Sequence, residues 1–216
     1  MKRILYVTAG VVLFSACKQS TQNAGEATEV KAASAEAVTY AIDKSASTVK
    51  WEGAKLTETV HTGNVGITEG SLSARQGKLE AGNFTIDMNS ITNSDLTDTA
   101  YANKLMGHLK SADFFQTDSF PTARFEISGV EAATSPDSAK VTGNLTLKGV
   151  TKSISFPAKV SLSDSTVDAS ARITINRNDW GVIWGGTQTD KKIKDYLKNN
   201  LIKDDISFDV ALKGRK

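Results

Sequence analysis

The side chains of this sequence that could take part in acid–base chemistry are two histidines, His61 and His108, and several paired aspartates. His108 opens the crowded stretch GHLKSADFFQTDSFPTARFEI, residues 107–127, which also contains Asp113 and Asp118. An imidazole held beside a carboxylate can act as a general base. Neither histidine belongs to an HExxH motif, and the sequence contains no GxSxG, GxxxxGK[ST] or strand-linked GxGxxG motif. We therefore predict no catalytic residues, no metal site and no cofactor, and we expect that the protein is not an enzyme.

Other interpretations of these side chains stay open at this point. Adjacent carboxylates such as Asp204 and Asp205 are typical of solvated turns. His61 stands at the start of a glycine-punctuated segment, where it could contact a ligand at the mouth of a barrel. An enzyme that acts on a bound ligand through His61 or His108 remains a third hypothesis, after the two binding and structural hypotheses described below.

Residues 1–16 have the pattern of a signal peptide. A short basic start is followed by an apolar run, residues 4–14, that is too short to span a membrane, and two small residues come next. The cleavage point is predicted directly before Cys17. Because Cys17 is the one cysteine of the chain, it cannot form an internal disulfide.

The segment that ends at Cys17, LFSAC, resembles the lipobox of bacterial lipoproteins. The resemblance implies that Cys17 is lipidated, becomes the mature N-terminus and anchors the protein to a membrane. The alternative is an ordinary signal peptide that leaves a free thiol. With the anchor, the expected location is the bacterial cell envelope, on the periplasmic side of a membrane.

Residues 17–37 contain almost no large apolar side chain after the cysteine, so we predict a lipidated N-terminus followed by a flexible tether. The chain has 26 basic and 24 acidic residues, and two of the basic residues, Lys2 and Arg3, belong to the predicted signal peptide. The remaining charge is balanced, which gives no reason to expect a nucleic-acid partner. The sequence leaves open whether the protein is a monomer or a dimer.

From Val38 onward, apolar and polar residues alternate with the period of two that is typical of strands with one buried face. The pattern repeats through residues 38–216, which we assign to one β domain. Asp98 and Asp190 can each cap a short helix with an apolar face. Two short helices cannot cover a large sheet, so we predict an all-β fold, an antiparallel barrel of about eight strands with two short helices.

Four segments of the domain resemble the YceI-like family of bacterial envelope proteins. They are YAIDKSASTVKW at residues 40–51, FTIDMNSITNSDL at residues 84–96, the stretch at residues 107–127, and VTGNLTLKGVTKSISFPAKV at residues 141–160. A weaker match is INRNDWGV at residues 175–182. The resemblance implies a lipocalin-like barrel with an apolar tunnel that binds a long amphiphile, such as a polyisoprenoid, an isoprenoid quinone or a fatty-acyl lipid.

The candidates for the ligand-binding wall are strand residues whose side chains are expected to face the interior. Two tryptophans in the loop after residue 176 are candidates for the mouth of the tunnel. Small inward residues such as Gly143 and Ala158 are expected to leave room, although they could also lie beneath bulky neighbours. In that alternative the barrel is filled, and the protein is a structural or stress-related envelope protein that acts through its outer surface. The ligand-binding candidates are Trp51, His61, Phe84, Ile86, Phe125, Ile127, Leu145, Leu147, Ile173, Trp180, Trp184, Phe208 and Val210.

Overall fold

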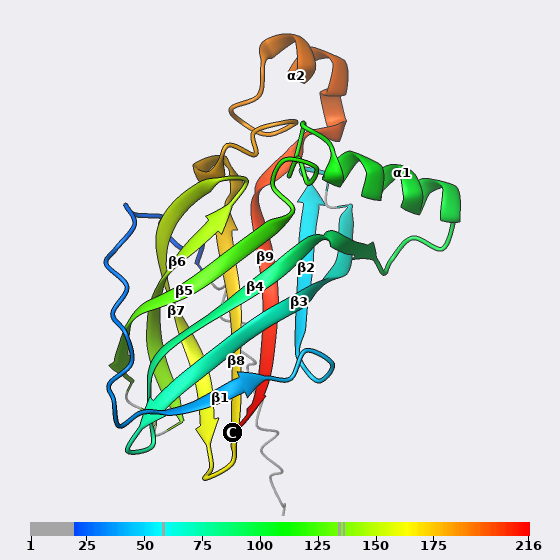
Figure 1. Ribbon diagram of the computed structural model, residues 1–216. Helices are drawn as coiled ribbons and strands as arrows, with labels where there is room; N and C mark the ends of the chain where they lie inside the picture. Colours follow the sequence, from blue (N-terminus) through cyan, green and yellow to red (C-terminus); the bar gives the residue numbers. More distant parts are fainter. Residues whose placement is uncertain (1–19, 58, 134, 136) are drawn as a thin grey trace, which may run out of the picture.

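The structure, a computed structural model, describes residues 20–216 apart from positions 58, 134 and 136 (Figure 1). The predicted signal peptide and Cys17 lie outside the described residues. Within the described part of the chain, no helix combines the length and the apolar character needed to cross a membrane.

Nine antiparallel strands form one closed barrel, which confirms the predicted fold class (Figure 1). Each strand from β2 to β9 pairs with its sequence neighbour, and β9 pairs with β2 to complete the ring. The strands are β1 Val38–Ile42, β2 Thr48–Lys55, β3 Val60–Arg75, β4 Lys78–Asn93, β5 Thr122–Ala132, β6 Ser138–Leu147, β7 Val150–Leu162, β8 Thr166–Asn176 and β9 Ile202–Arg215.

The extra strand, β1, shares one position of the ring with β2. β1 pairs with the last residues of β3 and β9, and β2 pairs with the first part of β3 and of β9. The two strands therefore lie one above the other between the same two neighbours. Nine strands fill eight positions around the barrel, in agreement with the predicted number.

The two helices lie at the end of the barrel where β2 ends and where β3 and β9 begin, which we call the mouth (Figure 1). Helix α1, Thr99–Lys110, begins after Asp98, whose side chain accepts hydrogen bonds from the backbone N–H groups of Ala100 and Tyr101. Helix α2, Lys191–Leu197, is capped by Asp190 in the same way. A 3-10 turn, η2 Lys198–Asn200, follows α2. Both caps were predicted from the sequence.

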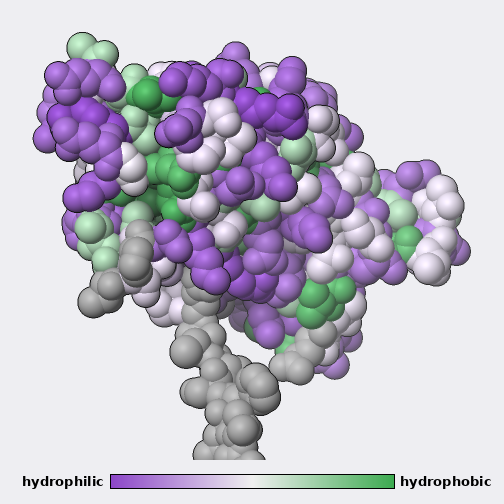
Figure 2. Space-filling view, turned by 90° about the horizontal axis from the view of Figure 1, so that it is seen from below, coloured by the Kyte–Doolittle hydropathy of each residue, from purple (hydrophilic) through white to green (hydrophobic). Residues whose placement is uncertain are grey.

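The opposite end of the barrel, the closed end, carries the hairpins at residues 75–78 and 162–166 and the C-terminus. Figure 2, the view from below, shows mostly hydrophilic residues over this end, with smaller hydrophobic areas between them. Inside it, large side chains such as Tyr40, Leu72 and Val167 are between 0% and 5% exposed. These side chains belong to the hydrophobic core that fills the barrel toward its closed end.

Residues 20–37 lie against the outside of the barrel, although composition predicted a flexible tether. The backbone N–H of Gln22 donates to the carbonyl of Thr174 on β8, and Gly25 exchanges two backbone hydrogen bonds with Ser153 on β7. The backbone N–H of Thr28 then donates to Asn144 Oδ1 at 2.9 Å. Composition did not indicate these contacts because they use backbone groups and polar side chains rather than apolar surface.

This segment, residues 20–28, which we call the strap, lies where two strands of the barrel separate. β7 and β8 pair only through residues 159–162 and 167–170, near the closed end. Toward the mouth, Gln22 bonds to β8 and Gly25 bonds to β7. The strap thereby satisfies backbone groups on both strands that would otherwise lack a ladder partner.

Candidate binding cavity

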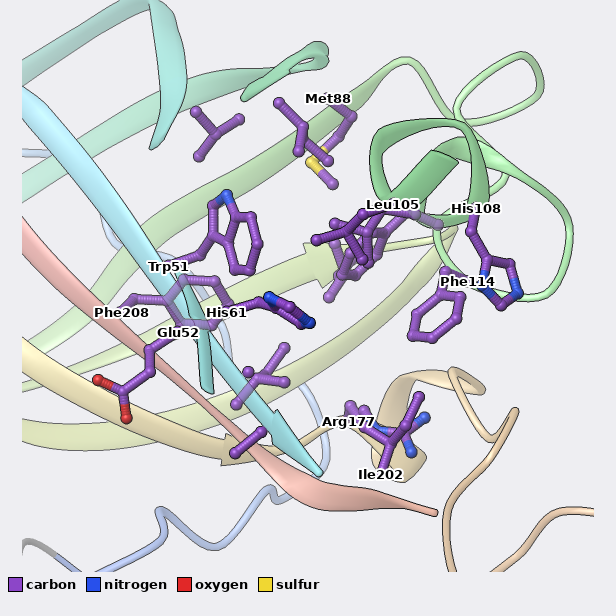
Figure 3. Close-up of a pocket in the computed structure, with 18 of the residues that line it drawn as sticks. Trp51, Glu52, His61, Met88, Leu105, His108, Phe114, Arg177, Ile202 and Phe208 are labelled. Carbon is purple, nitrogen blue, oxygen red and sulfur yellow. The ribbon is translucent and has the colours of Figure 1, made fainter. Parts of the chain in front are cut away.

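A cavity of about 550 Å³ opens at the mouth and extends into the upper half of the barrel. Its volume falls within the range of about 300–1,000 Å³ that is typical of small-molecule sites. The lining surface is almost entirely apolar and comes from strands β2 to β9, from α1, and from the segments that follow α1 and β8. In Figure 3, Trp51, Met88, Leu105 and Phe208 project into a common space. Such a surface can hold an apolar chain and offers it few polar contacts.

Three phenylalanine rings lie at the boundary between the cavity and the filled part of the barrel. Phe84 and Phe125 line the cavity, and their ring centroids are 5.6 Å apart. The ring of Phe125 is also 5.6 Å from that of Phe156, which does not line the cavity. These rings form its floor.

Gly143 allows the floor to form. A Cβ atom at Gly143 would lie 2.3 Å from Cζ of Phe125, so the ring of Phe125 occupies the space that a side chain on β6 would take. The structure therefore corrects the expectation that Gly143 leaves open room, and Ala158 likewise lies in the filled core. Gly53 does leave open room, because it lines the cavity and no atom lies within 4 Å of the position of a Cβ.

One side of the mouth is closed by a contact between α1 and the loop that follows β8. The imidazole of His108 packs edge-on against Trp184, with centroids 4.4 Å apart, and against Phe114, with centroids 4.9 Å apart. His108 Nε2 lies 3.1 Å from Asp113 Oδ2. His108 thus joins the helix, the turn after it and the loop, and Figure 3 shows it beside Phe114.

The loop that carries Trp184 is held by Arg177, which is 1% exposed. The Nη1 group of Arg177 donates to the carbonyl oxygens of Val182 and Trp184, and Nε donates to that of Lys203 on β9. Arg177 Nη2 lies 3.9 Å from Asp204 Oδ1. The guanidinium therefore fixes the loop against the first residues of β9, and the position of Trp184 depends on it.

Asp204 completes this attachment by accepting hydrogen bonds from the backbone N–H and the hydroxyl of Thr187. Burial alone would raise the pKa of Asp204, but the hydrogen bonds from Thr187 and the nearby charge of Arg177 lower it overall. The carboxylate is thus favoured in its charged form, as the contact with Arg177 requires.

His61 lies on the other side of the mouth, where Nδ1 is 2.8 Å from Asp95 Oδ2. Asp95 also accepts hydrogen bonds from the backbone N–H of Thr62 and from the side chain of Asn93. Burial acts to raise the pKa of Asp95, and these hydrogen bonds outweigh it, so the pKa is lowered. The pair places an oriented imidazole on the cavity lining.

Eleven of the predicted ligand-binding residues line the cavity: Trp51, His61, Phe84, Ile86, Phe125, Leu145, Leu147, Ile173, Trp184, Phe208 and Val210. Ligand binding by these residues stays a prediction. Two others lie elsewhere. Ile127 faces inward as expected, but it is two residues nearer the closed end than Phe125 and packs in the filled core. Trp180 belongs to a 3-10 turn, η1 Arg177–Trp180, and is 0% exposed, with Nε1 donating to the carbonyl of Leu145.

Several lining residues were missed because they come from outside the strand pattern. Leu105 and Leu109 form the apolar face of α1, which the sequence revealed without showing what the face covers. Phe114 and Phe115 belong to the stretch at residues 107–127, which is a corner between α1 and β5 and contributes to the upper wall. The described residues contain no group of three or more histidine, cysteine, aspartate or glutamate side chains placed to hold a metal ion.

Comparison with known protein families matches residues 40–213 to the YceI-like domain. A UPF0312 protein from Pseudomonas putida is 31% identical over 161 residues, which cover 71% of this chain and 81% of the relative. A UPF0312 protein from Pseudomonas aeruginosa is 46% identical over a shorter stretch of 68 residues, 32% of this chain and 34% of the relative.

Two solved structures share the fold. A polyisoprenoid binding domain from Saccharophagus degradans, implicated in plant cell wall breakdown, has a TM-score of 0.60 and 18% identity, and the alignment covers 82% of this chain and 97% of that domain. BcnA from Burkholderia cenocepacia has a TM-score of 0.58 and 21% identity, with 80% of this chain and 98% of BcnA covered.

Proposed function

This chain belongs to the YceI-like family, and from that premise we propose that it binds a long hydrophobic amphiphile inside its barrel and is a binding protein rather than an enzyme. The observation that carries the proposal is the apolar cavity of about 550 Å³ at the mouth. An apolar chain removed from water gains about 25 cal/mol for each Å² buried. The polyisoprenoid binding domain with the same fold adds support for a ligand of this class.

The ligand class includes polyisoprenoids, isoprenoid quinones and fatty-acyl lipids. The aromatic floor limits how far a chain can enter, so the deepest part of the ligand would contact Phe84 and Phe125, and its polar end would lie at the mouth near His61 and Trp184. The depth of the cavity, rather than a set of hydrogen bonds, would select among such ligands.

We further propose that Cys17 is lipidated and holds the protein at a membrane of the bacterial cell envelope, on the periplasmic side. The lipobox-like segment LFSAC supports this. Replacement Cys17→Ser is expected to move the protein from the membrane fraction to the soluble fraction of the envelope when the membranes are washed with salt, which weakens electrostatic binding but not an acyl anchor. An unchanged membrane fraction would contradict the anchor.

Native mass spectrometry of the purified protein, together with organic extraction, tests the binding proposal. We expect a co-purified lipid, and binding of a prenyl quinone or a fluorescent fatty acid to delipidated protein. If no lipid co-purifies and neither probe binds, the proposal is wrong, and the alternative of a protein that acts through its outer surface is favoured.

A pair of glycine variants localises the ligand. Gly53→Leu places a side chain in the cavity, where no atom lies within 4 Å of the Cβ position, and should lower probe affinity at least tenfold. Gly107→Leu is the matched control, because its Cβ position is equally free of neighbours but Gly107 is exposed on α1. Equal affinities for the two variants would show that the ligand binds outside this cavity.

A further inference from the structure

The mouth of the barrel is bordered by exposed apolar side chains. Among the described residues, six large hydrophobic side chains are exposed, and five of them lie on segments at the mouth. Tyr196 on α2 is 83% exposed and Tyr101 on α1 is 66% exposed. The other three are Leu56, Val60 and Ile183. The closed end, in contrast, presents mainly hydrophilic residues (Figure 2).

The exposed apolar residues of the mouth stand beside a basic segment. Residues 190–203, DKKIKDYLKNNLIK, contain five lysines and two aspartates. Lys191, Lys192 and Lys198 are exposed on α2 and its following turn, next to Tyr196. The rest of the predicted mature chain has 19 basic and 22 acidic residues, so residues 190–203 are basic relative to the remainder. Basic side chains with interleaved aromatic residues are complementary to an anionic lipid surface.

The first residues of the strap bind to the half of the barrel that contains the mouth. Thr21 Oγ1 donates to Asp205 Oδ2 near the start of β9, and Gln22 bonds to β8 next to Ile175. Cys17 precedes Ser20 by three residues, which can span about 10 Å at most. A lipid on Cys17 would therefore hold the mouth half of the barrel close to the membrane.

We propose that the mouth is a membrane-docking surface that fits a bilayer containing anionic phospholipid, with Tyr196 and Tyr101 at the interface and the lysines of α2 near the head groups. This inference rests on the proposed function, because docking in this orientation places the cavity opening against the bilayer. A hydrophobic ligand could then move between bilayer and barrel without crossing water.

Vesicle binding tests the docking surface without the acyl anchor. The protein is the chain from residue 17 onward with Cys17→Ser, which keeps every described residue and its contacts. It should bind vesicles of phosphatidylcholine with about a third phosphatidylglycerol, and binding should weaken with added salt. Binding to neither vesicle type, or equal binding to phosphatidylcholine alone, would overturn the proposal.

Two double variants with the same change in charge separate the mouth from the closed end. Each lysine near an anionic surface contributes about a fivefold effect on binding, so Lys191→Gln with Lys192→Gln should weaken vesicle binding about 25-fold. Lys44→Gln with Lys78→Gln, at exposed positions of the closed end, is the matched control and should have little effect. Similar losses in both pairs would contradict a docked mouth.

Orientation can be read from single-cysteine variants, because Cys17→Ser removes the one native cysteine. An environment-sensitive fluorophore at Tyr196→Cys should shift to the blue when anionic vesicles are added, and the same label at Lys78→Cys should not. A shift at Lys78→Cys alone would reverse the proposed orientation. Ligand occupancy is measured in the same samples. Vesicle binding without any co-purified lipid would contradict the proposed function and leave docking intact. Co-purified lipid without vesicle binding would contradict docking alone.

Discussion

The closed half and the mouth half of this barrel are built from the same strands with the same alternation of apolar and polar residues, yet they pack differently. In the closed half, side chains such as Leu72 and Phe156 are buried in the hydrophobic core. In the mouth half, the inward residues surround a cavity instead. Alternation therefore determines which residues face inward. Whether the interior is filled depends on which inward residues lie at the same level along the barrel axis.

The connections between strands also differ between the two ends of the barrel. Short polar hairpins cover the closed end, and β1 adds a further strand there beside β3 and β9. At the mouth two connections, β4 to β5 and β8 to β9, are much longer and contain α1, α2 and the loop fixed by Arg177. The mouth is therefore the half in which ligand entry would take place.

The largest expected effect is on stability, when one phenylalanine ring is removed from each half in turn. Phe156→Ala in the filled half should lower the free energy of unfolding by about 3–5 kcal/mol, because it leaves a cavity in a packed core. Phe208→Ala removes a ring that already faces the cavity, and should cost only about 2 kcal/mol because fewer contacts are lost. Urea unfolding measures both. Equal costs would show that the two halves are packed alike.

Asp204 offers a test of the mouth loop through pH. Because its pKa is lowered in the folded state, Asp204 stabilises the protein above the unfolded-state value of about 4. This contribution is lost as the pH falls through the folded-state pKa. Asp204→Asn should therefore cost about 2 kcal/mol at neutral pH and progressively less in acid.

Unfolding at pH 7 and pH 3 checks this expectation, with Asp164→Asn in an exposed turn of the closed end as the control. The control should show nearly the same stability as the parent at both values. A cost of Asp204→Asn that is the same at both pH values would mean that its charge does not hold the loop.

Alanine substitutions of two inward-facing glycines compare the filled core at Gly143 with the open cavity at Gly53. Gly143→Ala should destabilise by about 1–3 kcal/mol, since the new methyl group collides with the ring of Phe125. Gly53→Ala should change stability by less than about 1 kcal/mol and can raise it, because its Cβ position is open and alanine restricts the unfolded chain. Thermal unfolding compares them, and a larger loss at Gly53 would contradict the position of the cavity.

The smallest expected effect concerns the strap, which bonds to the mouth half between β7 and β8. Asn144→Ala removes its two hydrogen bonds to the backbone of Thr28 and should cost about 1 kcal/mol. Hydrogen exchange of residues 22–28 should become faster. Thr146→Ala, on the same strand but bonded to Thr151 rather than to the strap, is the control and should leave this exchange unchanged.

Much of the fold could be predicted from the sequence because strand alternation and helix caps are local signals. Asp98 and Asp190 marked the helix starts, and the inward-facing alternation identified part of the cavity wall, the part that lies on the strands. The strap could not be predicted, since its contacts join residues 20–28 to strands more than a hundred residues away through backbone groups. Trp180 was misplaced because a 3-10 turn directs its indole into the core.

The period of two and the two aspartate caps are properties of neighbouring residues, and they are enough to predict an antiparallel barrel with two short helices. The height at which residues meet across the barrel is set by strand register, which joins distant residues. The register pairs Phe125 with Leu145 and Ile127 with Gly143. The ring of Phe125 lies over Gly143 and ends the cavity there, and Ile127 lies in the filled half. The extent of the cavity therefore follows from contacts between strands, because no local pattern specifies which side chains share one level.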